Sequence, residues 1–380
     1  MKQLNILMLT PFYPPHAGGV EYYAKDLSEH LSQAGHTITI LTADIPSGSP
    51  LEPSRFRVIS YPAFEFIHNY PIPKFWTSQF QKILQTEKDN LPDIIITHTR
   101  FFFSSLIGMF LAHSLKIPRL HIEHGSSFVQ SKNILITFLA WLYDHMIGKR
   151  VLKRANAIIA VSHSVQKFIQ TLASEIQSTV IYRGFNIKKI QSIPINQNVW
   201  GGHSEKIKLL YIGRIIPSKG IDDLLSALTG LSLKNWVCFL VGDEQTPGEY
   251  ARKIKILGLQ ENIILLGSKP WDETIGILKG ADIFINPSHS EGIPTTVIEA
   301  SLCGIPTIAT DVGGTREISE SITLIPLKSP DAIRKSIEIT VGNSLEQHQI
   351  AEQHKWSVQE KFSWENTLPN FLSTLESLRP

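Results

Sequence analysis

Short apolar segments alternate with helix-forming segments along almost the whole chain, and this alternation constrains the fold more than any other feature. In the first half the apolar segments are 6–9, 37–41, 57–61, 93–97, 118–122, 155–161 and 179–182, and in the second half they are 208–212, 236–241, 262–266, 281–285, 306–310 and 323–325. Strands that alternate with helices form parallel sheets covered on both faces. The sequence therefore predicts an α/β fold of two Rossmann-like domains in tandem, with parallel sheets facing a central cleft.

The boundary between the two domains is predicted from composition. At 380 residues the chain is long enough for two separate cores. Pro194, Gly201, Gly202 and several polar residues predict a linker near 193–204. We expect an N-terminal domain over 1–193 and a C-terminal domain over 203–359. The last helical segment has no strand after it, so we expect 360–380 to pack back on the N-terminal domain.

Overall composition is that of a soluble, cytoplasmic globular protein. The net charge is +2, which gives no reason to expect nucleic acid as a partner. Cys238 and Cys303 are the only cysteines, and both lie in apolar patterns. We interpret them as core residues of a protein in a reducing compartment. The apolar segment 4–9 is too short for a secretory signal and is typical of a first strand.

The segment 287–300 has the pattern of a strand end, a loop and a helix start, where backbone N–H groups bind anions and polyols. Two carboxylates, Glu291 and Glu299, bracket this turn. The backbone donors that it offers are those of Gly292, Ile293, Thr295 and Thr296. A structural interpretation competes with this one, because Thr296 and Glu299 have the spacing of a capping box.

A second loop with charged residues follows the first strand of the C-terminal half. Arg214 and Lys219 leave that strand end together, and Gly220 opens the next helix. Two cations beside a helix N-terminus suit a diphosphate leaving group, since charge-assisted hydrogen bonds contribute about 1.5–3 kcal/mol each. The alternative is that both are surface charges flanking a loop.

In the N-terminal half, Gly18-Gly19 follows the first strand and His124-Gly125 follows another strand tip. The glycine pair allows close approach to a phosphate, although a plain tight turn is the alternative. Its spacing is not that of a dinucleotide site. His121 and Glu123 share one strand face and His124 points the other way, which argues against a metal site. His98 is a weaker candidate of the same kind, and a structural role is the alternative for both His98 and His124.

One segment departs from the α/β pattern. Residues 134–147 are rich in Leu, Ile, Phe, Trp and Tyr, and Lys149, Arg150, Lys153 and Arg154 follow. This segment is too short to span a bilayer, which takes about 20 residues. Either it is a buried helix with a solvated basic end, which we favour slightly, or 134–154 lies on an anionic membrane surface. The aromatic residues at 75–76 and 101–103 could extend the same surface.

Taken together, these motifs resemble the retaining glycosyltransferases of family 4, which have the GT-B fold. The residues that carry the resemblance are Gly18-Gly19, His124-Gly125, Gly213-Arg214, Lys219-Gly220, Glu291 and Glu299, Val241-Gly242-Asp243, Pro287-Ser288, Gly304-Ile305-Pro306, Gly313-Gly314, Glu317, and Phe362 to Glu365. The resemblance covers nearly the whole chain. Two motifs depart from it: Arg183 to Asn186 stands where the family commonly has Asn-Gly-x-Asp, and Gly242-Asp243-Glu244 where it has Gly-Asp-Gly. We transfer no role to Arg183, and nucleotide identity stays open.

The resemblance implies that 1–193 is the acceptor-side domain and 203–359 the nucleotide-sugar-binding domain. It also implies roles for individual residues. Glu299 would bind the ribose, Arg214 and Lys219 the diphosphate, and His124 would lie by the sugar and acceptor. Other donor-binding residues would be Gly18, Gly19, Glu291, Gly292, Ile293 and Thr295. Family members generally need no metal or other cofactor. The favoured mechanism is a front-face one, in which the leaving phosphate helps to deprotonate the acceptor.

The sequence thus predicts a metal-independent, retaining hexosyltransferase with a nucleotide-diphosphate sugar as donor. The expected acceptor is a glycan or a lipid-linked glycan, in cell-surface polysaccharide or lipopolysaccharide biosynthesis at the inner membrane face. Two alternatives stay open. A nucleotide-sugar epimerase would convert the donor without an acceptor, and a silent scaffold would bind no nucleotide sugar.

Overall fold

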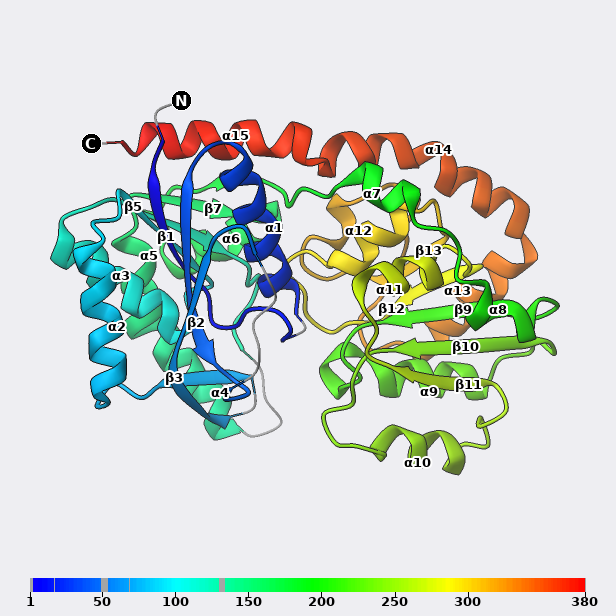
Figure 1. Cartoon of the computed structure of the whole chain (residues 1–380). Coiled ribbons are helices and arrows are strands. Elements are labelled where there is room, and N and C mark those ends of the chain that lie inside the picture. The colour runs from blue at the N-terminus through cyan, green and yellow to red at the C-terminus, as the bar shows by residue number, and fades with distance from the viewer. Residues whose placement is uncertain (1–2, 17, 49–53, 68, 130–133, 380) are drawn as a thin grey trace. The chain divides into compact units, whose positions relative to one another are not determined.

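The chain divides into two compact units. The computed structural model describes residues 3–379 except 17, 49–53, 68 and 130–133. The N-terminal unit comprises Met1–Arg183 together with Thr367–Pro380, and the C-terminal unit comprises Gly184–Asn366. Each unit is built around its own sheet (Figure 1). The boundary lies at Arg183/Gly184, ahead of the segment predicted as a linker.

The N-terminal unit contains an 8-stranded sheet in the order β4-β3-β2-β1-β5-β6-β7-β8. Its strands are β1 (Asn5–Leu9), β2 (Thr37–Asp44), β3 (Arg57–Ile67), β4 (Tyr70–Pro73), β5 (Ile94–His98), β6 (Arg119–Glu123), β7 (Ala157–Ala160) and β8 (Thr179–Val180). Its helices are α1 (Gly19–Gln33), α2 (Ser78–Asp89), α3 (Phe103–Leu115), α4 (Ile134–Tyr143), the π-helical turn η1 (Asp144–Gly148), α5 (Lys149–Lys153) and α6 (His163–Leu172). Every pairing is parallel except that of β3 with β4.

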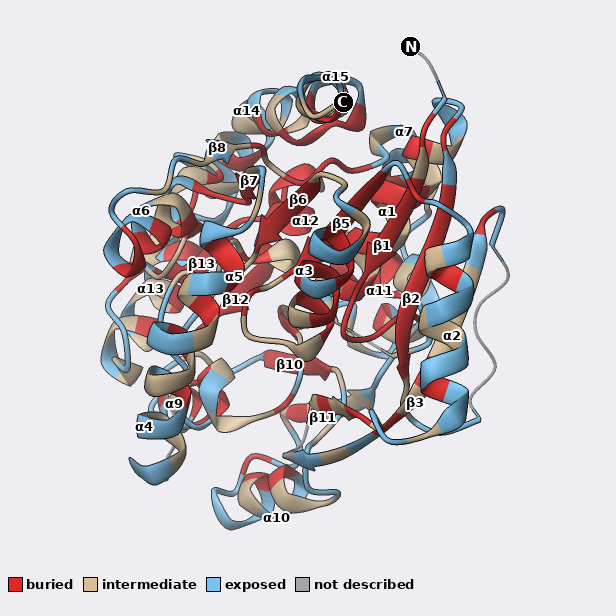
Figure 2. Cartoon of the chain, turned by 90° about the vertical axis from the view of Figure 1, so that its left-hand side faces the viewer, coloured by how far each residue is buried: buried red, intermediate tan, exposed pale blue. Residues whose placement is uncertain are grey.

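The central strands of this sheet are buried along most of their length because both faces are covered. Ile94, Ile95 and Ile96 in β5 are all buried, and Figure 2 shows β1, β5 and β6 as buried throughout most of their length. A parallel sheet with helices on both faces needs such continuous apolar strands rather than alternating ones. This physical requirement is why the seven segments of this half could be predicted from hydropathy.

The edge of the sheet was only partly predicted. Strand β3 continues well past the predicted segment 57–61, and β4 pairs with it in antiparallel fashion. Pro71 and Pro73 lie within β4. Proline cannot donate to a ladder and is tolerated in edge strands, so two prolines in four residues obscured the strand in the sequence.

The C-terminal unit contains a 6-stranded parallel sheet in the order β11-β10-β9-β12-β13-β14. Its strands are β9 (Ile207–Ile212), β10 (Trp236–Val241), β11 (Ile263–Gly267), β12 (Ile283–Asn286), β13 (Thr307–Thr310) and β14 (Thr323–Ile325). All six correspond to predicted segments. Its helices are α7 (Ile187–Ser192), α8 (Gln197–Trp200), η2 (Gly201–His203), η3 (Pro217–Lys219), α9 (Ile221–Thr229), α10 (Glu249–Ile256), α11 (Trp271–Leu278), α12 (Thr295–Leu302), η4 (Thr315–Glu317), α13 (Pro330–Gly342) and α14 (Ser344–Phe362).

The last helix, α15 (Trp364–Ser377), begins in the C-terminal unit, and its residues from Thr367 onward group with the N-terminal unit. Its apolar side chains Phe371 and Leu375 are buried.

The expected linker near 193–204 is wrong, because this segment is part of the C-terminal core. Asn196 caps α8 by accepting a hydrogen bond from the Val199 N–H at 3.3 Å. Trp200 is buried and stacks on Phe239 with 4.4 Å between ring centroids, and its indole N–H donates to the Ile277 carbonyl. The glycine-containing segment 193–204 is therefore not a flexible linker. Its Trp200 side chain packs it against the C-terminal unit.

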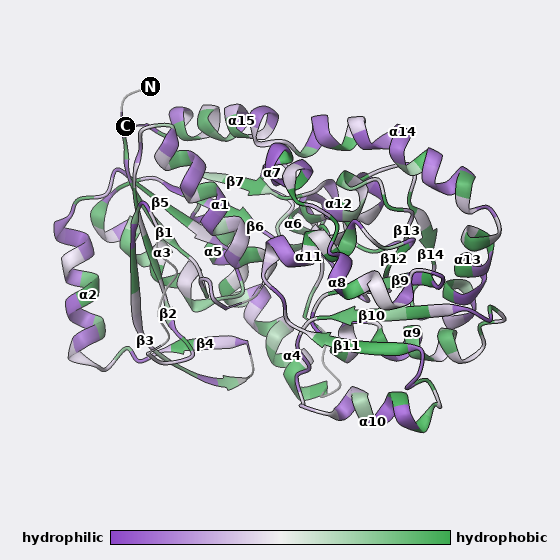
Figure 3. Ribbon diagram, turned by 45° about the vertical axis from the view of Figure 1, so that its right-hand side comes forward, coloured by the Kyte–Doolittle hydropathy of each residue, from purple (hydrophilic) through white to green (hydrophobic). Residues whose placement is uncertain are grey.

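The expectation of a buried helix at 134–147 is also wrong for its first part. In α4 the side chains of Ile134, Leu135, Phe138 and Leu139 are 53–85% exposed, and Ala140 is the buried residue of the helix. Figure 3 shows α4 coloured largely as hydrophobic. Burial resumes in η1 and α5, where Asp144, Gly148, Val151 and Leu152 are covered. The helix therefore presents apolar side chains to its surroundings.

Replacing Trp200 by alanine tests whether the supposed linker is a core element. Loss of a buried tryptophan should lower the free energy of unfolding of the C-terminal unit by about 3–5 kcal/mol. The matched control is Trp356→Ala in α14, whose side chain is 68% exposed and whose loss should cost under about 0.5 kcal/mol. Urea denaturation measures both, and equal midpoints for the two variants would contradict the assignment.

Candidate functional site

In the C-terminal unit three loops are held against one another at the carboxyl ends of β9, β12 and β13. Gly220 has φ of +70°, and a Cβ there would lie 2.0 Å from the Pro287 carbonyl oxygen. The His289 N–H donates to the Ser218 carbonyl at 3.0 Å. Backbone therefore meets backbone directly, which only glycine at 220 permits.

The third loop joins in the same way. Gly313 has φ of +55°, and a Cβ there would lie 1.8 Å from the Glu291 carbonyl oxygen. The Gly314 N–H donates to the Gly292 carbonyl at 2.8 Å. Gly313 and Gly314 thus hold the backbone of residues 291–292 in place by direct contact. This contact positions the chain that leads into α12.

Two of the predicted donor-binding residues contact each other. Lys219 Nζ lies 2.5 Å from Glu291 Oε1, and both side chains are mostly buried. Their sequence separation gave no sign of this pair. Arg214 lies at the end of β9 and is exposed, with its carbonyl accepting a hydrogen bond from the Tyr211 hydroxyl at 2.8 Å. Burial raises the pKa of Tyr211 well above its ordinary value; Glu291 adds to this effect and Arg214 opposes it, so both charges act on this hydroxyl.

Glu299 does not form the capping box that was the alternative interpretation. Helix α12 begins at Thr295, with Pro294 in the cap position and no side-chain cap bond. Glu299 is 4% exposed, and its Oε1 accepts a hydrogen bond from the Trp271 indole N–H at 2.8 Å. Thr296 Oγ1 instead accepts from the Asn286 side chain. A carboxylate held inside the second turn of α12 is better placed to accept hydroxyl groups than to cap the helix.

In the N-terminal unit, Gly18 and Gly19 form the start of α1, as predicted. A Cβ at Gly18 would lie 2.2 Å from Glu21 Oε2, so a carboxylate already packs against this glycine. Glu21 is in turn 3.2 Å from His16 Nδ1. An anion bound at this helix end would share it with Glu21.

The His124 side chain lies among groups from three other elements. Its Nε2 is 3.2 Å from His98 Nδ1, and its ring meets Tyr23 of α1 edge-on with 5.1 Å between centroids. Arg183 forms an ion pair with Asp26 at 2.6 Å, and its Nη1 is 3.5 Å from the Gly19 carbonyl oxygen. The structure thus places His124 near the start of α1, through Tyr23 and the charge of Arg183.

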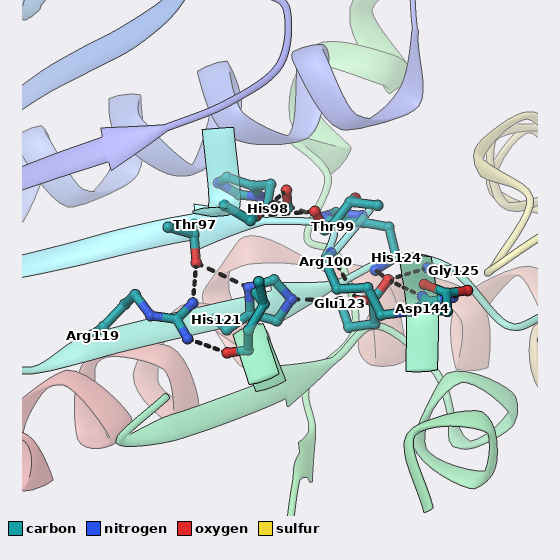
Figure 4. A network of polar contacts seen from close by, with 12 residues as sticks. Thr97, His98, Thr99, Arg100, Arg119, His121, Glu123, His124, Gly125 and Asp144 are labelled. Atoms are coloured by element: carbon teal, nitrogen blue, oxygen red, sulfur yellow. Dashed lines mark hydrogen bonds and ion pairs between the residues drawn. The ribbon is translucent and has the colours of Figure 1, made fainter. Parts of the chain in front are cut away.

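The strand before His124 carries a buried polar network (Figure 4). His121 Nε2 lies 3.3 Å from Glu123 Oε2, so the two share a face as predicted. Glu123 also lies 3.1 Å from the Arg100 guanidinium. Desolvation opposes the charge of Glu123, but Arg100 and the hydrogen bonds around it hold its pKa well below the ordinary value. Burial lowers the pKa of His121.

Two family models match the chain, one to each half. The model for Glycosyltransferase Family 4 matches residues 17–189, and the model for Glycosyl transferases group 1 matches residues 192–356.

The chain belongs to the family 4 glycosyltransferases.

Curated relatives agree with this assignment, and a solved structure agrees with the fold. The chain is 29% identical over the whole of both proteins to an uncharacterized glycosyltransferase, MJ1069, of Methanocaldococcus jannaschii. It is 26% identical to the GPI3 subunit of a phosphatidylinositol N-acetylglucosaminyltransferase of Saccharomyces cerevisiae, over 83% of this chain and 69% of that protein. The solved structure of HepE of Anabaena with UDP-glucose is similar in fold, with a TM-score of 0.79, 19% identity and coverage of 99% and 100%. The fold is therefore GT-B-like.

Several residues of this glycosyltransferase that bear on the site were not found from the sequence. Tyr23, Arg183, Tyr211 and Trp271 each contact a predicted site residue or lie within its electrostatic reach. Arg183 was set aside because it departs from the family motif. The only available signal was its position at the end of a strand. No group of three or more metal-ligating side chains is found among the described residues.

Lowering the pH should destabilise the N-terminal unit through His98, which is fully buried, and His124, which is partly buried. Burial lowers the pKa of His124 to about 4 from the ordinary 6.5, and the same cause lowers the pKa of His98 well below its ordinary value. Between about pH 6.5 and 4 the unfolded chain therefore binds more protons than the folded chain. The free energy of unfolding therefore has its full value above about pH 6.5 and falls as the pH drops through this window. Because the His124 side chain keeps some exposure, its contribution is at most about 3 kcal/mol.

Urea denaturation at about pH 7.5 and about pH 5 measures this dependence. His124→Asn should reduce the difference between the two pH values, whereas His113→Asn, at an exposed position of α3, should leave it unchanged. The same pH dependence in wild type and His124→Asn would contradict the burial of a neutral imidazole.

Proposed function

We propose that this chain is a retaining hexosyltransferase that moves a sugar from a nucleotide-diphosphate sugar to a glycan or lipid-linked glycan, in cell-surface polysaccharide or lipopolysaccharide biosynthesis. The observation that carries the proposal is the Lys219–Glu291 ion pair, held at the start of α12 with Glu299 one helical turn farther along. The Lys219 cation and the start of α12 match a diphosphate. Glu291 matches the donor sugar, and Glu299 matches the ribose.

Donor binding would exchange this ion pair for contacts to the ligand. The Lys219 ammonium would pair with a diphosphate oxygen in place of Glu291. Glu291 would then accept hydrogen bonds from sugar hydroxyls beside the Gly292 and Ile293 backbone. The Lys219 and Glu291 side chains keep exposures of 20% and 14%, so a diphosphate can reach the lysine. A charge-assisted bond to phosphate would contribute about 1.5–3 kcal/mol and replace the contact to Glu291.

Transfer would then proceed on one face of the sugar. The bond from the anomeric carbon to the β-phosphate oxygen breaks, and the bond to the acceptor oxygen forms on the same face. The acceptor proton passes to the departing phosphate oxygen, whose charge Lys219 and the exposed Arg214 stabilise. His124, neutral near pH 7 because its pKa is lowered to about 4, would accept or donate a hydrogen bond rather than supply positive charge. Gly18, Gly19 and Thr295 complete the proposed donor contacts.

Replacing Lys219 or Glu299 should abolish transfer while the fold survives. Lys219→Met removes a leaving-group cation, and Glu299→Gln removes a ribose acceptor but keeps the side-chain volume beside Trp271. We expect transfer to fall at least about 100-fold in each. Lys234→Met and Glu261→Gln, at exposed positions of the same unit, are the matched controls.

The assay follows labelled sugar from a donor identified by a thermal-shift screen of UDP-, GDP- and ADP-sugars. A bound donor at about a hundredfold excess over its Kd stabilises the fold by about 2.7 kcal/mol. Wild-type rates in Lys219→Met and Glu299→Gln would remove the site assignment. Donor conversion without an acceptor would show an epimerase instead, and no stabilisation by any nucleotide sugar would favour a scaffold.

The exposed apolar face of α4 supports two parts of the proposal. The acceptor would be lipid-linked, and the enzyme would bind peripherally to the inner face of the membrane. No helix among the described residues could cross a membrane. The apolar face of α4 is followed within α5 and just beyond it by Lys149, Arg150, Lys153 and Arg154, of which the last three are exposed. Apolar side chains beside basic ones complement an anionic lipid surface, where each cation contributes about 1 kcal/mol. The GPI3 relative, whose name includes a lipid acceptor, agrees with this assignment.

Flotation with phosphatidylglycerol vesicles tests the membrane assignment. Replacing the four basic residues by glutamine, or Ile134 and Phe138 by serine, should reduce the bound fraction at least about tenfold. The matched control is Ile256→Ser, which removes an exposed apolar side chain from α10 of the other unit. Equal partitioning of all these proteins would contradict the assignment, as would equal binding to uncharged phosphatidylcholine vesicles.

A further inference from the structure

We propose that Arg100 is a positioning residue that ties the His124–Gly125 turn to the base of α4 through Glu123 and Asp144. The inference rests on the proposed function only in taking this turn as part of the acceptor side. Arg100 is 2% exposed and follows β5. It is the only residue of the described chain that forms ion pairs with both of these carboxylates.

At one end of this chain of contacts, Glu123 holds the backbone of the turn. Its Oε1 accepts hydrogen bonds from the N–H groups of His124 at 3.1 Å and Gly125 at 2.8 Å. A Cβ at Gly125 would lie 3.0 Å from Arg100 Nη1 and 3.2 Å from Glu123 Oε1. The turn is therefore packed directly on the ion pair, and the position of the carboxylate sets the position of the two N–H groups.

At the other end, Asp144 anchors α4. Asp144 is the first residue of the π-helical turn η1 and is fully buried, although α4 immediately before it is mostly exposed. Its Oδ2 lies 2.9 Å from Arg100 Nη2 (Figure 4). A π-helical turn adds a residue to the helical ladder and redirects the following side chains, and such turns occur often at functional sites. Here it directs a carboxylate inward at the end of an exposed apolar helix.

A second set of hydrogen bonds fixes the orientation of Glu123. Arg119 Nη1 donates to Thr97 Oγ1 at 2.9 Å, so the Thr97 hydroxyl is left to donate to His121 Nδ1 at 2.9 Å. His121 Nε2 then carries the proton that faces Glu123 Oε2. One neutral tautomer of His121 satisfies every contact. Glu123 Oε2 also accepts from the Arg100 backbone N–H at 3.0 Å, which leaves Oε1 for the turn and for the Arg100 guanidinium.

The arrangement predicts a difference between arginine and lysine at position 100. A planar guanidinium bridges two carboxylates through separate nitrogens, whereas an ammonium is a single point of charge. Arg100→Lys therefore keeps the buried charge but loses one of the two links. Asp144→Asn keeps the shape of the link to α4 and removes its charge.

Amide hydrogen exchange and steady-state kinetics of the full chain test the proposal. In Arg100→Lys and Asp144→Asn, exchange at the His124 and Gly125 amides should accelerate at least about tenfold, and kcat/KM for the acceptor should fall about 10- to 100-fold. The Kd for the nucleotide-sugar donor should stay within about twofold of wild type. Phe80→Leu, a buried substitution in α2, supplies a control of reduced stability.

Unchanged exchange at these two amides in both variants would overturn the positioning role, whatever the enzyme does. Equal losses for donor and acceptor, matching those of Phe80→Leu, would also overturn it, because they indicate a general loss of stability. Absence of transfer in the wild type would count against the proposed function alone, since the exchange measurement needs no activity. If a variant does not fold, the double substitution Arg100→Gln/Asp144→Asn, which removes a buried cation and a buried anion together, takes its place under the same criteria.

Discussion

Direct contact between loop backbones is the constraint on which the C-terminal unit depends. Gly220 lies against Pro287, and Gly313 lies against Glu291, at distances that leave no room for a side chain. A third close contact joins Gly242 to Gly213, where a Cβ would lie 1.9 Å from a carbonyl oxygen. Parallel strands bring their loops to one edge, and glycine allows those loops to touch. The result is a rigid support under Lys219, Glu291 and the start of α12.

The two units use charge in different ways. In the C-terminal unit the Lys219–Glu291 pair retains some exposure, so a ligand can compete for it. In the N-terminal unit Arg100, Glu123 and Asp144 are nearly inaccessible to solvent and hydrogen-bonded on several sides. Removing one partner of a buried pair costs about 3–5 kcal/mol. The first arrangement suits ligand exchange and the second suits positioning.

Sequence patterns predicted those features of the fold that depend on neighbouring residues alone. Short apolar segments revealed thirteen of the fourteen strands, β4 with its two prolines being the exception. Glycines and charges at strand ends revealed the loops of the candidate site. Predictions failed where the role of a residue depends on a partner far away in the sequence. Trp200 changes a glycine-rich linker into a core element because Phe239 receives it, and nothing near Trp200 indicates this.

The same reason explains what was missed in and around the site. Hydropathy marked 134–147 as apolar but could not tell whether other elements cover it, and α4 is exposed. The pairing of Glu299 with Trp271 and of Arg100 with Asp144 joins residues 28 and 44 positions apart. Such contacts are set by tertiary packing, so the fold class could be predicted from the sequence while the partners of each functional side chain could not.

Hydrogen–deuterium exchange with and without the donor tests the central claim most directly, because it locates the ligand without requiring an acceptor. We expect a nucleotide-diphosphate sugar to protect the backbone amides of segments 213–220 and 287–300 from exchange. The free sugar should not protect them. Loss of this protection in Lys219→Met, with protection retained in Lys234→Met, would identify the loop cation as a ligand of the diphosphate. Protection confined to other segments, or equal protection in both variants, would contradict the placement of the donor.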